Sequence, residues 1–155
     1  MVTFRTALEE FTPKAVTLAW DYVQRDDRVE TLWVYVTVEA GVSVYDAFYR
    51  IGDSILEPQK APQALGFDGD INDLVEPFYD DLGEAVDELV DAVGVEDVPT
   101  RMVLRFRTAD QDYVGDFSYA PLQPHVPDSD QVSDSEVADR WLERLRRTGN
   151  DSATL

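Results

Sequence analysis

Carboxylates are the side chains of this chain with the most chemical potential, since there is no cysteine and His125 is the only histidine. Closely spaced carboxylates can act as general acid and base, bind metal ions, or attract a positively charged partner. Between Lys60 and Arg101 there is no basic residue, but there are twelve carboxylates: Asp68, Asp70, Asp73, Glu76, Asp80, Asp81, Glu84, Asp87, Glu88, Asp91, Glu96 and Asp97. Their spacing decides which of these roles the sequence favours.

The spacing favours neither catalysis nor a metal site. Carboxylate pairs occur throughout the segment, so no single pair stands out as a general acid beside a base. Asp68, Asp70 and Asn72 resemble the start of a calcium-binding loop. That loop then requires a glycine and later a glutamate, and Asp73 and Tyr79 stand at those positions. We expect no catalytic residue, no metal site and no cofactor.

Other enzyme motifs are also missing from the sequence. It contains no G-x-S-x-G, H-E-x-x-H, P-loop or dinucleotide-binding pattern. His125 lies between Pro124 and Pro127, where a solvated loop histidine is the simplest interpretation. The sequence therefore indicates a protein that is not an enzyme.

Most of the carboxylates lie on one predicted amphipathic helix that begins near Asp73 and ends near Val93. Four like-charged pairs are spaced i,i+4 and five are spaced i,i+3. At ~0.2–0.5 kcal/mol for each pair, this repulsion amounts to roughly 2–4 kcal/mol at low salt. A merely solvated face, a basic partner and a salty environment are the three alternatives that account for it. A partner-binding surface would consist of Asp73, Asp80, Asp81, Glu84, Asp87, Glu88 and Asp91.

Composition limits the kinds of partner. The 155 residues suit one domain with its own core, and the net charge of −19 disfavours nucleic acid and anionic membranes as ligands. A basic protein is the natural partner for such a charge. The start of the chain does not have the pattern of a signal peptide, and no segment is apolar enough to span a membrane, so we expect a cytoplasmic protein.

The first half of the chain predicts a helix, a hairpin and a loop. Residues 3–24 have helical periodicity, with Thr12 as an N-cap and Pro13 in the first turn after a shorter helical segment. Residues 31–39 and 42–51 are rich in β-branched and aromatic side chains, and Gly41 between them indicates a hairpin. Residues 52–69 predict a loop with at most a short strand.

The second half predicts a helix, a second hairpin and a last helix. A capping box of Asp73 and Glu76 starts the acidic helix, and Gly94 ends it. Residues 101–107 and 113–119 alternate as strands. A further capping box at Ser133 starts a helix that continues to about Arg147. We expect a single α+β domain over residues 1–148, with an antiparallel or mixed sheet of four to six strands, helices mainly on one face, and a flexible tail over residues 149–155.

The arginines and aromatic residues have simple structural interpretations. Arg101, Arg105 and Arg107 are expected to balance Asp112 and Asp116 across the second hairpin. On the last helix, Arg140, Arg144 and Arg147 are expected to form a solvated face that can rest on the acidic helix. Core packing is the expected role of Trp33, Tyr35, Tyr45 and Tyr49.

The order of the elements and some short motifs resemble a known family. Phe48-Tyr49 ends the second strand, and Asp116-Phe117-Ser118-Tyr119 ends the last. Together with the acidic helix and the C-terminal helix that contains Trp141, these residues resemble the YezG-like immunity proteins of bacterial polymorphic toxin systems, over roughly residues 10–146. The resemblance implies a small cytoplasmic α+β protein that binds and blocks a cognate toxin, often a nuclease with a basic cleft.

Two other functions remain open. A secretion chaperone or adaptor would hold a client protein mainly through apolar contacts, and its binding would tolerate salt. A salt-adapted protein, with or without enzymatic activity, would carry its charge for solubility, and molar salt would stabilise it. The sequence leaves the oligomeric state and the identity of the toxin open.

Overall fold

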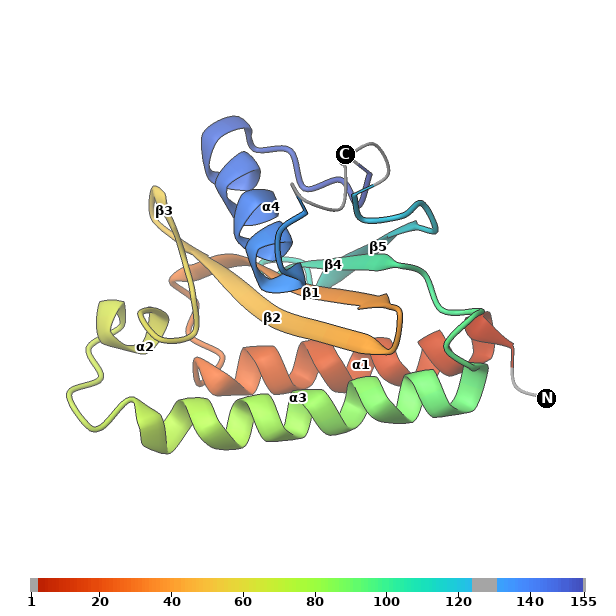
Figure 1. Ribbon diagram of the computed structural model, residues 1–155. Coiled ribbons are helices and arrows are strands. Elements are labelled where there is room, and N and C mark those ends of the chain that lie inside the picture. The colour runs from red at the N-terminus through yellow and green to blue at the C-terminus, as the bar shows by residue number, and fades with distance from the viewer. Residues whose placement is uncertain (1–2, 124–130, 155) are drawn as a thin grey trace.

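The computed structural model describes residues 3–123 and 131–154 (Figure 1). Its helices and strands are, in chain order, α1 (Phe4–Tyr22), β1 (Val29–Glu39), β2 (Val42–Ile51), β3 (Ser54–Leu56), α2 (Ala61–Ala64), α3 (Asn72–Val93), β4 (Arg101–Arg107), β5 (Asp112–Ser118) and α4 (Asp134–Thr148). His125 lies outside the described residues.

The strands form one antiparallel sheet in the order β3-β2-β1-β4-β5. Helices α1 and α3 run side by side across one face, and α4 packs on the other (Figure 1). The prediction of an α+β fold with four to six strands is confirmed. The long helix pair forms the larger layer, and α4 is the smaller cover.

Burial on both sides explains the sequence of the central strand β1. Leu32, Val34 and Val36 point to the α1–α3 layer, while Trp33 and Tyr35 point to α4. A strand that faces water on one side would alternate polar and apolar residues. The nearly continuous apolar run of β1 therefore reflects two cores, one on each side of the sheet.

The β1–β2 hairpin fixes the register of the sheet. Glu39 pairs with Val42 across a two-residue turn. Both turn residues have positive φ, 52° at Ala40 and 78° at Gly41, as a type I′ turn requires. The predicted hairpin is confirmed, and β1 begins two residues earlier than predicted.

Two predicted helix caps are wrong. α1 is one continuous helix in which Thr3 is the N-cap, so Thr12 does not start it and Pro13 lies inside it. α3 starts without a capping box, since the residue before it, Ile71, makes no side-chain cap. An Asp70 carboxylate oxygen accepts the backbone N–H of Asn72 at 3.0 Å instead, which starts the helix earlier than Asp73.

α4 begins as predicted, but the segment after it does not extend away from the domain. The Ser133 hydroxyl caps the first turn, and Gly149 ends the helix in a left-handed conformation. Residues 150–154 then lie along the α4 face of the sheet, and Ala153 is completely buried. The sequence predicted a loose tail here because residues 150–154 carry no periodic pattern, and the contacts of the tail are with residues distant in sequence.

Candidate protein-binding surface

The candidate surface is the outer side of α3. The inner side of this helix is apolar, and Phe78, Leu82, Val86 and Leu89 are buried against α1 and the sheet. With a period of 3.6 residues, the remaining positions must point outward. All seven carboxylates predicted to bind a partner are exposed: Asp73, Asp80, Asp81, Glu84, Asp87, Glu88 and Asp91.

These carboxylates are almost without internal counter-charges. Lys14 of α1 donates a hydrogen bond from Nζ to Glu88 Oε2 at 2.7 Å, and this bond raises the pKa of Lys14. Within the ranges that the structure describes, Glu88 is the only one of the seven whose carboxylate forms an ion pair. Six carboxylates therefore face solvent with their charge uncompensated by the fold.

A close approach to β2 holds the middle of α3 on the sheet. Gly83 packs directly over Tyr45, and a Cβ at this position would lie 2.4 Å from the Tyr45 hydroxyl oxygen. A glycine inside a helix costs about 1 kcal/mol relative to alanine. Here it lets the helix backbone approach the sheet, which sets the position of the neighbouring acidic residues.

A hydrogen-bonded tether holds the first half of the helix. Tyr79 of α3 donates from its hydroxyl to Asp46 Oδ1 of β2 at 2.6 Å, and Gln59 donates to Tyr79 at 3.3 Å. Burial raises the pKa of Asp46 to about 6. Burial, followed by the Asp46 charge, raises the pKa of Tyr79. The tether therefore includes a carboxyl group that titrates near neutral pH.

An open groove lies beyond the C-terminal end of α3. It has a volume of about 470 Å³ and runs between the β1–β2 turn, the α3–β4 connection and the end of β5. Val95 and Tyr119 line it and are 47% and 59% exposed. The Thr100 hydroxyl donates to the carbonyls of Ser118 and Ala120 and so fixes the backbone on both sides of Tyr119. Glu96 adds a carboxylate to the lining.

Sequence reasoning did not identify this groove. Its lining comes from three connections that are far apart in the chain. The one local signal was Val95, an apolar residue that directly follows the helix-ending Gly94. The structure thus adds two apolar candidates, Val95 and Tyr119, to the predicted acidic ones.

The opposite face uses its charges internally, which corrects two predictions about arginines. Arg107 pairs with Asp112 at 3.3 Å as predicted, but Arg105 pairs with Asp151 of the tail at 3.1 Å. Asp116 is not a partner of these arginines, since it accepts the backbone N–H of Ala153 at 2.7 Å. The partners of Arg105 and Asp116 thus come from the tail, which is not part of the hairpin.

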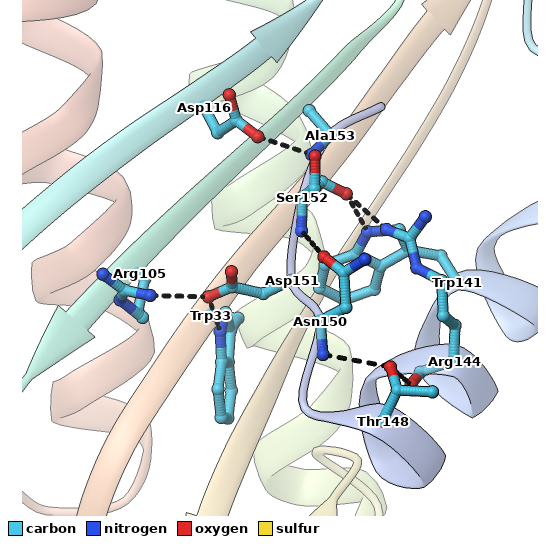
Figure 2. A network of polar contacts seen from close by, with 10 residues as sticks. All are labelled: Trp33, Arg105, Asp116, Trp141, Arg144, Thr148, Asn150, Asp151, Ser152 and Ala153. Atoms are coloured by element: carbon cyan, nitrogen blue, oxygen red, sulfur yellow. Dashed lines mark hydrogen bonds and ion pairs between the residues drawn. The ribbon is translucent and has the colours of Figure 1, made fainter. Parts of the chain in front are cut away.

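Arg144 is also bonded inside the molecule. Figure 2 shows the tail between Trp33 and Arg105 on one side and Trp141 and Arg144 on the other. Arg144 donates to the carbonyls of Ser152 and Thr154. The prediction of a solvated face holds for the exposed Arg140 and Arg147 and is wrong for Arg144. The alternative that this face rests on the acidic helix is wrong, because the sheet separates α4 from α3 (Figure 1).

The described residues offer neither a metal site nor a membrane span. Among residues 3–123 and 131–154, no group of three or more acidic or histidine side chains is arranged to hold a metal ion. In the same part of the chain, no helix has the length and apolarity needed to cross a bilayer.

No protein-family model matches the chain, and no curated protein is significantly similar to it.

Proposed function

We propose that this protein is an immunity protein that binds a basic bacterial toxin, of the nuclease type, and blocks it without catalysis in the cytoplasm. The observation that carries the proposal is the row of exposed carboxylates on α3, six of which have no ion pair in the described part of the chain. The resemblance to the YezG-like immunity proteins, which also includes the aromatic motifs at the ends of β2 and β5, supports it further.

The energetics support a partner at this surface. Like charges at helical spacing are destabilising, and among residues 3–123 and 131–154 only Lys14 forms an ion pair with one of them. A basic cleft that normally holds nucleic acid would supply the missing positive charge. Long-range attraction would then speed the encounter, and contact would remove the repulsion.

The groove has exposed apolar side chains, which the acidic surface lacks. Charged rims mainly set association rate and specificity, whereas most binding energy comes from a few desolvated apolar anchors. Val95 and Tyr119 are exposed apolar side chains just beyond α3, and Glu96 lies beside them. We propose that an apolar side chain of the toxin, flanked by basic residues, enters this groove.

The experiment that tests the function starts with capture of the partner from the source organism. The captured protein is expressed alone in a host, and co-expression of this chain should restore growth. If growth is not rescued, the immunity function is wrong. If the captured protein binds equally well in low and high salt, a secretion chaperone replaces the proposal.

Charge reversal then tests the surface. Substituting Glu84, Asp87 and Asp91 by Lys should slow association with the captured toxin at least tenfold. The control variant substitutes Asp53, Asp139 and Glu143, three exposed carboxylates outside α3, and changes the net charge equally. If association slows equally in both variants, the effect comes from net charge alone, and α3 is not the binding surface.

A second matched pair tests the groove. Val95 and Val114 are both 47% exposed, and Val114 lies on the edge strand β5, away from the groove lining. Val95→Asp should speed dissociation of the toxin complex about tenfold or more, whereas Val114→Asp should not. If the two variants behave alike, the groove is not an anchor.

A further inference from the structure

The most unusual buried group of the molecule is Arg101, the first residue of β4. It is only 2% exposed, and its one hydrogen bond runs from Nη1 to the carbonyl of Ala153 at 3.0 Å. In the described part of the chain, its Nε and Nη2 atoms have no hydrogen-bond partner, and no carboxylate forms an ion pair with it. A buried charge without a counter-charge costs several kcal/mol, so this arrangement requires compensation.

A second guanidinium, that of Arg144, lies close to Arg101 and increases the positive charge that requires compensation. Arg144 donates to two tail carbonyls, but its buried Nε lacks a partner among residues 3–123 and 131–154. Burial, and after it the positive charge of Arg101, lower the pKa of Arg144. Two guanidiniums that repel each other therefore share one enclosed region beneath the tail.

Two hydroxyl groups of β1 face the same region. Thr37 is directly opposite Arg101 in the β1–β4 register, and the Arg101 guanidinium carbon lies 6.0 Å from the centre of the Tyr35 ring. Both residues are fully buried. The Tyr35 hydroxyl interacts with the Arg101 guanidinium, and neither hydroxyl has a hydrogen bond of regular geometry within the described ranges. Three guanidinium nitrogen atoms and two hydroxyl groups thus lack a regular hydrogen-bond acceptor in this region.

The carboxylates of this region do not bond to Arg101 or Arg144. The charge of Asp134 acts on Tyr35 but forms no ion pair with either arginine in the described part of the chain, and the other two carboxylates are Asp116 and Asp151. These two already accept hydrogen bonds from other groups (Figure 2). A water molecule would satisfy some donors but would leave the positive charge in place.

We propose that Arg101 and Arg144, together with the hydroxyls of Tyr35 and Thr37, bind one small monovalent inorganic anion of the size of chloride beneath the C-terminal tail. In the described part of the chain no carboxylate forms an ion pair with Arg101 or Arg144, which favours an anion there, and the near-complete burial of Arg101 favours a small monatomic one. The site lies on the α4 face and shares no residue with the groove proposed for the toxin, although Thr37 and Arg101 are chain neighbours of the groove residues Val38 and Thr100. The proposal does not depend on the toxin-binding function.

A crystal grown or soaked in sodium bromide tests the site directly. An anomalous bromide peak is expected within hydrogen-bonding distance of Arg101 Nε or Nη2 and near Arg144 Nε. A carboxylate of the chain itself on Arg101, or only an ordered water there, would overturn the proposal.

Thermal unfolding gives a second test in solution. Sodium chloride and sodium methanesulfonate at equal ionic strength screen surface charges equally, so screening alone cannot separate them. A specific chloride site should raise Tm by about 3 °C in chloride over methanesulfonate at concentrations several times Kd. Equal Tm values in the two salts would contradict the proposal.

Variants then assign the effect to the arginine. Arg101→Met should abolish the difference between the two anions, and Arg101→Lys, which keeps the buried charge but loses the donor fork, should reduce it. Arg140→Gln is the matched control, since Arg140 is an exposed α4 arginine, and it should keep the full difference. If the Met variant does not fold, an unchanged difference in the Lys variant is sufficient to reject the site.

Discussion

The helices on the two faces of the sheet differ in how many carboxylates they carry and in how they use them. α3 has eight acidic residues and no basic one, and its carboxylates point to solvent. α4 has four acidic residues and four arginines, and Arg144 and Arg146 donate to backbone carbonyls of other segments. Charged side chains that form hydrogen bonds or ion pairs within the molecule stabilise the fold, whereas charged side chains without such contacts are available to a partner.

The largest effect should come from removing the aromatic centre of the α4 face. Trp141 is 1% exposed, packs on Tyr35 and Phe48, and donates to the Ser152 carbonyl at 2.9 Å. Trp141→Ala should lower the free energy of unfolding in urea by about 3–5 kcal/mol. An exposed α3 substitution, Glu84→Ala, should change it by no more than about 0.5 kcal/mol. Similar losses in the two variants would erase the contrast between the faces.

The tail should be the next most sensitive element. Asp151 accepts hydrogen bonds from Trp33 at 3.0 Å and from Arg105 at 3.1 Å, so Asp151→Ala leaves two partly buried donors unpaired. The free energy of unfolding should fall by about 1–3 kcal/mol. Asp110→Ala removes an exposed ion pair with Arg107 and should cost less than about 1 kcal/mol. An Asp151 variant as stable as the Asp110 variant would mean that the tail does not stabilise the fold.

The tether between α3 and β2 should produce a pH dependence. The folded-state pKa of Asp46, about 6, lies above its ordinary value of 3.8, so the folded state binds this proton more tightly than the unfolded state. The contribution of this carboxyl group to stability therefore grows as pH falls from about 7 to about 4, by about 1–2 kcal/mol. Urea unfolding of the wild type and of Asp46→Asn at several pH values measures it as the change in their difference.

The exposed Asp53 provides the control for this titration. Asp53→Asn removes the same charge from a surface turn and should retain the wild-type pH dependence between pH 7 and pH 4. A constant difference between the wild type and Asp46→Asn over this range would show that Asp46 is not titrating as described.

The smallest effect should be a gain in stability on the acidic face. Asp80→Lys replaces two repulsive i,i+4 pairs, with Glu76 and Glu84, by attractive ones. It should raise the free energy of unfolding by about 0.5–1 kcal/mol at low salt, and the gain should disappear in molar salt. A loss of stability at low salt would show that repulsion along α3 is not a cost to the fold.

Local patterns in the sequence were sufficient to predict most of the secondary structure. The alternation of residues 101–107, the turn at Gly41 and the apolar stripe of α3 each depend on neighbours within a few positions. The caps predicted at Thr12 and Asp73 are wrong, because α1 runs on without a break from its N-cap Thr3, and Asp70 accepts the Asn72 N–H ahead of α3. Several polar residues can cap one helix, and their competition depends on the backbone around each.

The exposure of the acidic row was determined by the sequence alone. Once the apolar stripe of α3 faces the core, the helical period sends Asp80, Glu84 and Asp87 outward. Only the tertiary structure decided that Arg105 meets Asp151, that Arg101 is buried without a carboxylate, and that Val95 lies across a groove from Tyr119. These contacts join segments far apart in the chain, and no local periodicity encodes which distant segment a side chain will meet.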